Sequence, residues 1–120
     1  MSLVKTVGHT LLASMFIIGG YGAFKQPGGR VTKVENAGIP MARQATILNG
    51  GIMLIAGTTL AVGILPKLSA LLLIGSLVPT TLVGHNFWDE DAPQNRANQR
   101  MHFTKNFAMV GGLIAVLFEK

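Results

Sequence analysis

The stretch that decides the fold runs from Ala45 to Trp88 and reads ATILNGGIMLIAGTTLAVGIL, then Pro66 and Lys67, then LSALLLIGSLVPTTLVGHNFW. Each of its two apolar runs has 21 residues. As a helix, such a run reaches about 31 Å, which matches a bilayer hydrocarbon core of about 30 Å. Only a tight turn fits between the runs. The stretch therefore predicts two membrane-crossing helices packed as an antiparallel hairpin.

A third apolar run precedes this hairpin. It extends from Val7 to Phe24 and contains 18 residues, with only His9 near its start. A helix of this length reaches about 27 Å, which is enough to cross a bilayer. We expect His9, isolated near the outer start of this helix, to be hydrated.

A fourth run follows the hairpin, from Met101 to Phe118, but its uninterrupted apolar part is only 12 residues, Phe107 to Phe118. That part reaches about 18 Å, too short to cross alone. We therefore expect His102, Lys105 and Asn106 at or below the headgroup level, facing other helices or extending outward. The sequence predicts an all-α integral membrane protein, a four-transmembrane-helix bundle in one domain (1–120), with helices at 7–24, 45–65, 68–88 and 101–118.

Composition excludes several classes of protein. Hydrophobic residues make up 49% of the chain and charged residues 12%, so no extramembrane domain of any size is present. With no cysteine, the chain has no thiol chemistry of its own and no thiolate ligands for a cluster. There is no phosphate-binding loop, nucleophile elbow or pair of buried carboxylates. We therefore predict no catalytic residues and no metal or haem site.

Charged residues gather between the apolar runs. The net charge of +5 suggests membrane flanks rather than nucleic acid, because the basic residues stand singly at the ends of apolar runs. Residues 25–43 are expected to form a loop with a short interfacial segment at 31–39, and residues 89–100 a second loop. These two loops and the start of the fourth run hold seven Lys and Arg, against three elsewhere. The positive-inside rule then puts both termini outside a bacterial plasma membrane.

Small and polar residues predict how the helices associate. Helices in lipid pack through small residues and interhelical hydrogen bonds. We expect Asn49 to bond across the bundle and Pro79 to kink the third helix, its freed carbonyls being satisfied by nearby hydroxyls. The predicted small-residue seams pair Gly19 with Ala23, Gly57 with Ala61, Ala108 with Gly112, and Gly111 with Ala115.

One membrane edge collects the polar side chains that could carry function. The third helix closes with His85, Asn86 and Trp88, and the fourth opens with His102, Lys105 and Asn106 on one face. Two imidazoles, an ammonium and a carboxamide could hold an anion, a quinone carbonyl or a partner's carboxylate. The alternative is purely structural, since tryptophan suits an interfacial belt, lysine snorkels and the rest cap or cross-link helices.

Several short motifs together resemble the DoxX family of small bacterial membrane proteins. They are Leu48-Asn49-Gly50-Gly51 through Gly57, the hairpin Leu65 to Ala70, Pro79 to Trp88, Gln99 to Phe107, and Gly111-Gly112-Leu113. The resemblance implies a four-helix membrane protein. It also matches the family pattern at His85, Phe87, Trp88, Phe103, Lys105 and Asn106. The chain departs from many relatives in lacking a glutamate in the first turn of the second helix, which holds Ile47 and Asn49.

The resemblance implies association with membrane redox complexes, including a quinone-linked thiosulfate oxidoreductase and assemblies with a sulfurtransferase and a superoxide dismutase. We therefore expect an accessory or scaffold subunit of a membrane redox complex, more a non-catalytic subunit than an enzyme. The alternative is a quinone-binding subunit, with quinone as the one possible cofactor. Expected partners are membrane lipids, oxidoreductase subunits and a second copy of the chain. Transport of an anion is less favoured, because the opposite membrane half offers little polar lining.

Overall fold

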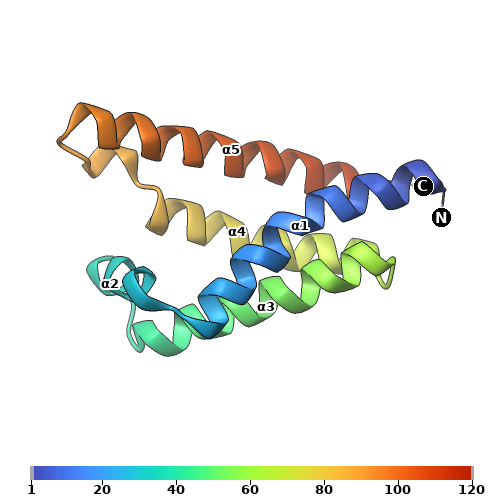
Figure 1. The fold of residues 1–120 in the computed structure, drawn as a ribbon, viewed down its shortest axis with the longest axis horizontal. Coiled ribbons are helices and arrows are strands. Elements are labelled where there is room, and N and C mark those ends of the chain that lie inside the picture. Colours follow the sequence, from blue (N-terminus) through green and yellow to red (C-terminus); the bar gives the residue numbers. More distant parts are fainter. Residues whose placement is uncertain (1, 120) are drawn as a thin grey trace.

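A computed structural model describes residues 2–119 and contains four long helices (Figure 1). Three of them have the length and hydropathy of membrane spans, counted as Leu3–Lys25, Ala42–Val62 and Pro66–Asp89. The fourth long helix does not meet that measure, because its first half is polar. The elements are α1 (Leu3–Lys25), α2 (Gly28–Asn36), α3 (Ala42–Val62), α4 (Pro66–Gly84), the 3-10 turn η1 (Phe87–Asp89) and α5 (Pro93–Leu117).

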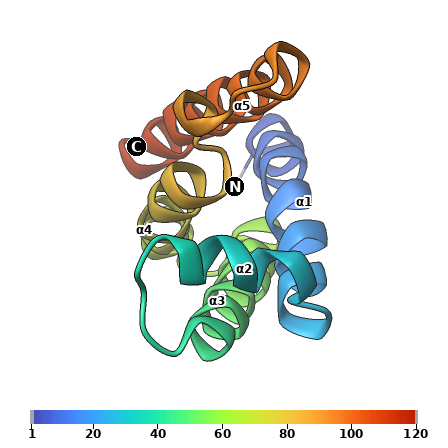
Figure 2. The same ribbon diagram turned by 90° about the vertical axis from the view of Figure 1, so that its left-hand side faces the viewer.

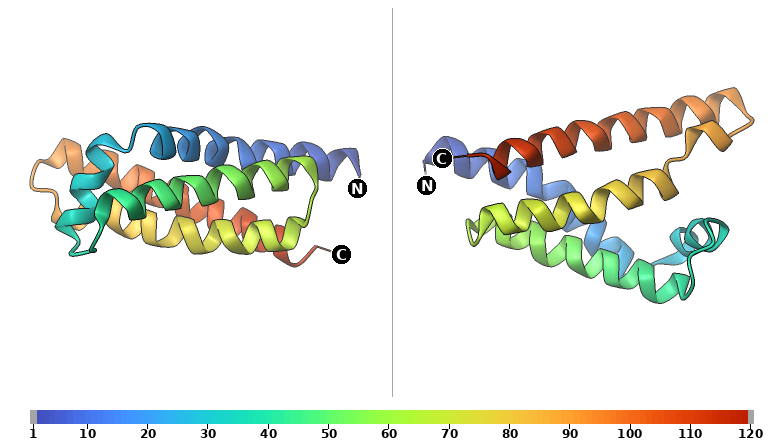
Figure 3. Two further views of the ribbon diagram at one scale, coloured as in Figure 1. Left: turned by 90° about the horizontal axis from the view of Figure 1, so that it is seen from below. Right: turned by 180° about the vertical axis from the view of Figure 1, so that it is seen from behind.

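The four long helices form a bundle in which α3 packs on α1 and α4, and α5 packs on α4 (Figure 2). Both chain ends and the α3–α4 turn lie together at one end of the bundle, which we call the terminal end (Figure 3). The short helix α2 and the η1 turn lie at the opposite end, which we call the α2 end.

The segments between the long helices differ from the sequence expectation. Residues 25–43 were expected to be mostly loop, but they contain the nine-residue helix α2. Helix α5 begins at Pro93, eight residues before Met101, because proline suits a first helical position and no breaker follows it. Helix α4 ends at Gly84, so Trp88 lies in η1 and not in the third helix.

The α3–α4 hairpin turns through Gly63 to Leu65. Gly63 (φ 79°) and Leu65 (φ 44°) both adopt the left-handed conformation. Pro66 does not form the turn, as the sequence suggested, but opens α4, where its missing N–H costs no helical bond. The hydroxyls of Thr59 and Ser69 lie 2.6 Å apart and join the two helices beside the turn.

The closest helix contact joins α1 and α3 through Gly20 and Gly50. A Cβ atom at Gly20 would lie 2.7 Å from the Gly50 carbonyl oxygen, and one at Gly50 would lie 2.6 Å from the Phe24 nitrogen. The predicted seam residue Gly57 lies farther along the same contact, against Phe16 and Ile17. Gly19, which was expected in the seam, borders open space instead, because it is one position out of phase with the contact.

The other predicted seam lies on α5, where the two glycines differ. A Cβ atom at Gly112 would lie 3.4 Å from the side chain of Leu12 on α1, so Gly112 packs within the bundle. Gly111 borders open space. It therefore takes no part in a seam within this chain.

The hydrophobic core crosses all four long helices. Along the last half of α5, the core residues Leu113 and Val116 lie between Asn106 and Glu119, which follows the helix. Three leucines from different helices are fully buried: Leu60, Leu73 and Leu113. The whole core consists of Ala13, Phe16, Met53, Ala56, Leu60, Ala70, Leu73, Leu77, Leu113 and Val116.

Asn49 joins α3 to α4 through two hydrogen bonds. Its amide nitrogen donates to the Thr80 hydroxyl at 2.7 Å, and its amide oxygen accepts from the Ser76 hydroxyl at 2.6 Å. Thr80 in turn donates to the Ser76 carbonyl, one residue beyond the carbonyl of Gly75 that Pro79 leaves without an N–H partner. The polar bridge thus lies beside the proline.

Replacing Asn49 by Ala is expected to lower the free energy of unfolding by about 1–2 kcal/mol, the range that interhelical hydrogen bonds reach in membrane bundles. The change removes both bonds and leaves Ser76, which is buried, without its acceptor. Unfolding in a denaturing detergent measures the effect. Thr58→Ala is the matched control, because the Thr58 hydroxyl bonds within its own helix and is exposed. Equal stability of the two variants would contradict the prediction.

Candidate functional site

The predicted polar residues lie at the end of α4, in the turn that follows it and on α5, and we call this cluster the polar edge: His85, Asn86, Trp88, His102, Lys105 and Asn106. His85 caps the end of α4, and Asn86 and Trp88 come from the η1 turn just after it. His102 and Lys105 lie on the first half of α5, and Asn106 lies just past its middle. Because α4 and α5 are antiparallel neighbours, the end of one lies beside the start of the other (Figure 1).

The two histidines of the polar edge stack on each other. The ring centroids of His85 and His102 are 5.0 Å apart with an interplanar angle of 22°. The Nδ1 atom of His85 also lies 2.6 Å from the amide oxygen of Gln99, so this ring nitrogen carries the proton and donates it. Gln99 was not predicted as a site residue. It lies one turn before His102, in a segment that the sequence assigned to a loop.

The other polar side chains differ in how far they are engaged. Asn106 is buried and donates to the Thr81 hydroxyl at 3.1 Å, joining α5 to α4. Asn86 donates to the Asp89 carboxylate at 3.1 Å within the η1 turn. Lys105 is exposed, and its ammonium donates a long hydrogen bond of 3.5 Å to Nδ1 of His102 one turn before it.

Aromatic rings form the outer part of the site. Phe87, Trp88 and Phe103 contact one another edge to face, with centroids 5.2–5.7 Å apart. Phe103 also contacts Phe107 one turn along α5, at 4.8 Å. These rings fix η1 against α5, while Trp88 remains 47% exposed. An exposed tryptophan on a rigid base is typical of membrane interfaces and of protein contacts.

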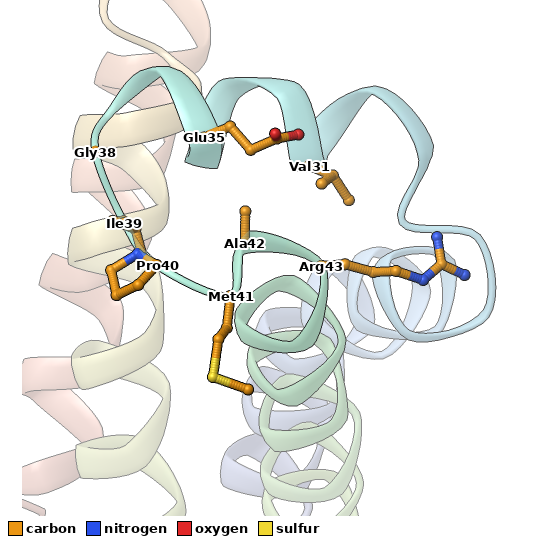
Figure 4. Close-up of a pocket in the computed structure, with 8 residues that line it drawn as sticks. All are labelled: Val31, Glu35, Gly38, Ile39, Pro40, Met41, Ala42 and Arg43. Carbon is orange, nitrogen blue, oxygen red and sulfur yellow. The ribbon is translucent and has the colours of Figure 1, made fainter.

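Two surface cavities lie away from the polar edge. One, of about 520 Å³, lies between α2 and the start of α3 and is lined by Glu35, Arg43 and their neighbours (Figure 4). The second, of about 430 Å³, is an apolar groove between α1 and α3. No residue of the polar edge lines either cavity. Among residues 2–119 there is also no group of three or more side chains suited to hold a metal ion.

A polar pair at the terminal end was not anticipated. His9 was expected to be hydrated, but it is 2% exposed, and its Nε2 lies 3.0 Å from both carboxylate oxygens of Glu119. Its Nδ1 is buried without a hydrogen-bond partner. The pair fixes the start of α1 to the end of the chain. No local pattern in the sequence signals it, since the two residues are 110 positions apart.

These features define a small all-helical membrane protein whose polar side chains gather at the ends of an apolar bundle. A family model described as DoxX matches residues 5–86, more than half of the chain, so the chain belongs to the DoxX family. The match ends at Asn86, so the part of the resemblance placed on residues 99–113 lies outside it. The comparisons with curated proteins and with solved structures found no match.

Proposed function

We propose that this DoxX-family protein is an accessory, non-catalytic subunit of a membrane redox complex and that the polar edge is its docking site. The observation that carries the proposal is which side chains of the polar edge bond within this protein and which remain exposed. His85, Asn86 and Asn106 each donate one hydrogen bond to another side chain of this protein. Trp88 and Lys105 remain exposed and offer an aromatic ring and a positive charge to the surroundings. Such a pair suits an acidic, partly apolar protein surface.

The same proposal places α5 across the membrane as a fourth span. Its 25 residues reach about 37 Å, and it packs on α4. Both termini then lie on one side of the membrane. By the distribution of Lys and Arg that side is the outside of a bacterial plasma membrane, so the polar edge faces the cytoplasm. A partner with a cytoplasmic catalytic domain would meet the edge there.

Purification in a mild detergent or in native lipid tests the docking site. We expect oxidoreductase subunits to copurify with the natural protein in a fixed ratio, identified by mass spectrometry. The variants Trp88→Ala and Lys105→Gln should each lower the partner's yield at least tenfold, because anchor residues dominate interface energies. Leu71→Ala is the matched control, since Leu71 is an exposed α4 side chain away from the polar edge.

The second candidate function is binding of a quinone at the polar edge. It is favoured by the exposed Trp88 ring and the exposed Lys105 ammonium, which could stack on a quinone ring and bond its carbonyl. Extraction of the purified protein distinguishes the two. A quinone retained by the natural protein and lost in Lys105→Gln, with no copurifying subunit, would overturn the accessory-subunit proposal.

A further inference from the structure

The outer face of α1 and α3 carries a groove lined by apolar residues and, at one end, by Gln44. It has a volume of about 430 Å³ and lies against Phe24 of α1 and six residues of α3: Gln44, Ile47, Leu48, Gly51, Ile52 and Ile55. Gly51 forms part of its floor, because a Cβ atom there would lie 3.4 Å from the Phe24 ring. In a bundle surrounded by lipid, such a groove accepts a hydrocarbon chain.

The length and position of the groove correspond to one leaflet of the bilayer. From Gln44 to Ile55 the α3 helix rises about 16 Å, close to half of a hydrocarbon core of about 30 Å. Gln44 lies near the start of the span Ala42–Val62, and Ile55 lies past its middle. The groove therefore runs from the membrane edge at the α2 end toward the bilayer centre.

Three positively charged residues, Lys25, Arg30 and Arg43, lie at the α2 end of the bundle, where the groove begins, and Arg43 itself lines the neighbouring cavity between α2 and α3. Lys25 follows the lining residue Phe24, and Arg43 precedes the lining residue Gln44. Arg30, on α2, folds back on the end of α1, where its guanidinium donates to the Gln26 carbonyl at 3.3 Å. Figure 4 shows Arg43 extending toward the α1–α2 link and away from Glu35. Within residues 2–119, none of these three cations forms a salt bridge with a carboxylate.

We propose that this groove is a binding site for an anionic phospholipid. One acyl chain lies in the apolar groove, and the headgroup phosphate lies among Lys25, Arg30 and Arg43. The acyl chain matches an apolar groove that is one leaflet long. The phosphate matches three cations at the depth where lipid phosphates lie. This site is separate from the polar edge, so a failure of the lipid proposal would leave the docking proposal unaffected, and the reverse.

Native mass spectrometry of the delipidated protein tests the site. Phosphatidylglycerol and phosphatidylcholine with the same oleoyl chains are added in separate experiments, and the bound lipid is counted at increasing collision energy. We expect one phosphatidylglycerol to stay bound at energies that remove phosphatidylcholine. Arg30→Gln with Arg43→Gln should reduce this preference at least tenfold. Gly51→Leu, which fills the floor, should reduce binding of phosphatidylglycerol at least tenfold.

Gly75→Leu is the control for the groove variant, because Gly75 is an exposed glycine of α4 with open space around it. It should bind lipid as the natural protein does, and circular dichroism should give equal helix content for all variants. The arginine variants change exposed side chains, so they test the headgroup site even if Gly51→Leu folds poorly. Equal retention of both lipids, or a dimer that Gly51→Leu abolishes, would overturn the proposal.

Discussion

Replacing Gly50 by Val is expected to separate α1 from α3 and to cause the largest loss of stability of any single change considered. A Cβ atom at Gly50 would lie within 3 Å of two backbone atoms, the Phe24 nitrogen and the Gly20 carbonyl oxygen. Backbone atoms of a packed helix cannot rotate away, so the helices must move apart and lose the contacts around them. We expect a loss of about 3 kcal/mol or more in the free energy of unfolding.

The matched control is Gly111→Val, because a side chain at Gly111 meets open space. Both changes put the same β-branched residue into a helix, so both variants lose the same helix propensity. The two variants differ only in whether the new side chain meets the α1–α3 contact. Denaturing-detergent titration of both variants, monitored by circular dichroism, gives the comparison. If Gly50→Val unfolded at the same detergent fraction as Gly111→Val, the close contact would not contribute to stability.

Removing the carboxylate in Glu119→Ala is expected to destabilise the bundle by about 1–3 kcal/mol, the cost of an unsatisfied buried polar group. Glu119 supplies the hydrogen-bond partner that the structure gives to the His9 ring, since Nδ1 is already unpaired. The variant leaves an imidazole buried with neither nitrogen bonded.

The double variant His9→Leu with Glu119→Ala separates pairing from packing. Replacing both members of a buried polar pair by apolar groups costs less than removing one. We therefore expect the double variant to be at least as stable as Glu119→Ala alone, as measured in the same detergent titration. Strictly additive losses from the two single changes would show that His9 and Glu119 act independently.

The bundle could be predicted from the sequence where length and hydropathy decide the structure. Two 21-residue apolar runs joined by two residues leave few arrangements other than a hairpin. It was harder to predict which residues of each helix face the neighbouring helix. With 15 glycines in the chain, many pairs have seam spacing, and nothing local distinguishes Gly20 from Gly19. Helix α2 was not predicted in full because nine mixed residues give a weak periodic signal.

The polar edge could be predicted in outline, because the end of α4 and the start of α5 are joined by a short connection. That topology brings His85 near His102, and the structure adds that their rings stack. Gln99 was missed because the helix was predicted to begin after it, although it shares a face with His102 once α5 starts at Pro93. The partner of His9 could not be found, since tertiary packing alone brings the two chain ends together.

The apolar core layer of Leu60, Leu73 and Leu113 has a consequence for the energetics of the membrane itself. It separates the His9–Glu119 pair from the Asn49 and Asn106 bonds at the other end, and its leucines are fully buried. Protons cross membranes along chains of water or polar groups, and hydrocarbon interrupts such chains. Among residues 2–119, this apolar layer therefore interrupts the polar side chains along which a proton could cross the bundle. A bundle of this kind adds no path for protons through the membrane, which is what the proposed accessory role in a redox complex would require.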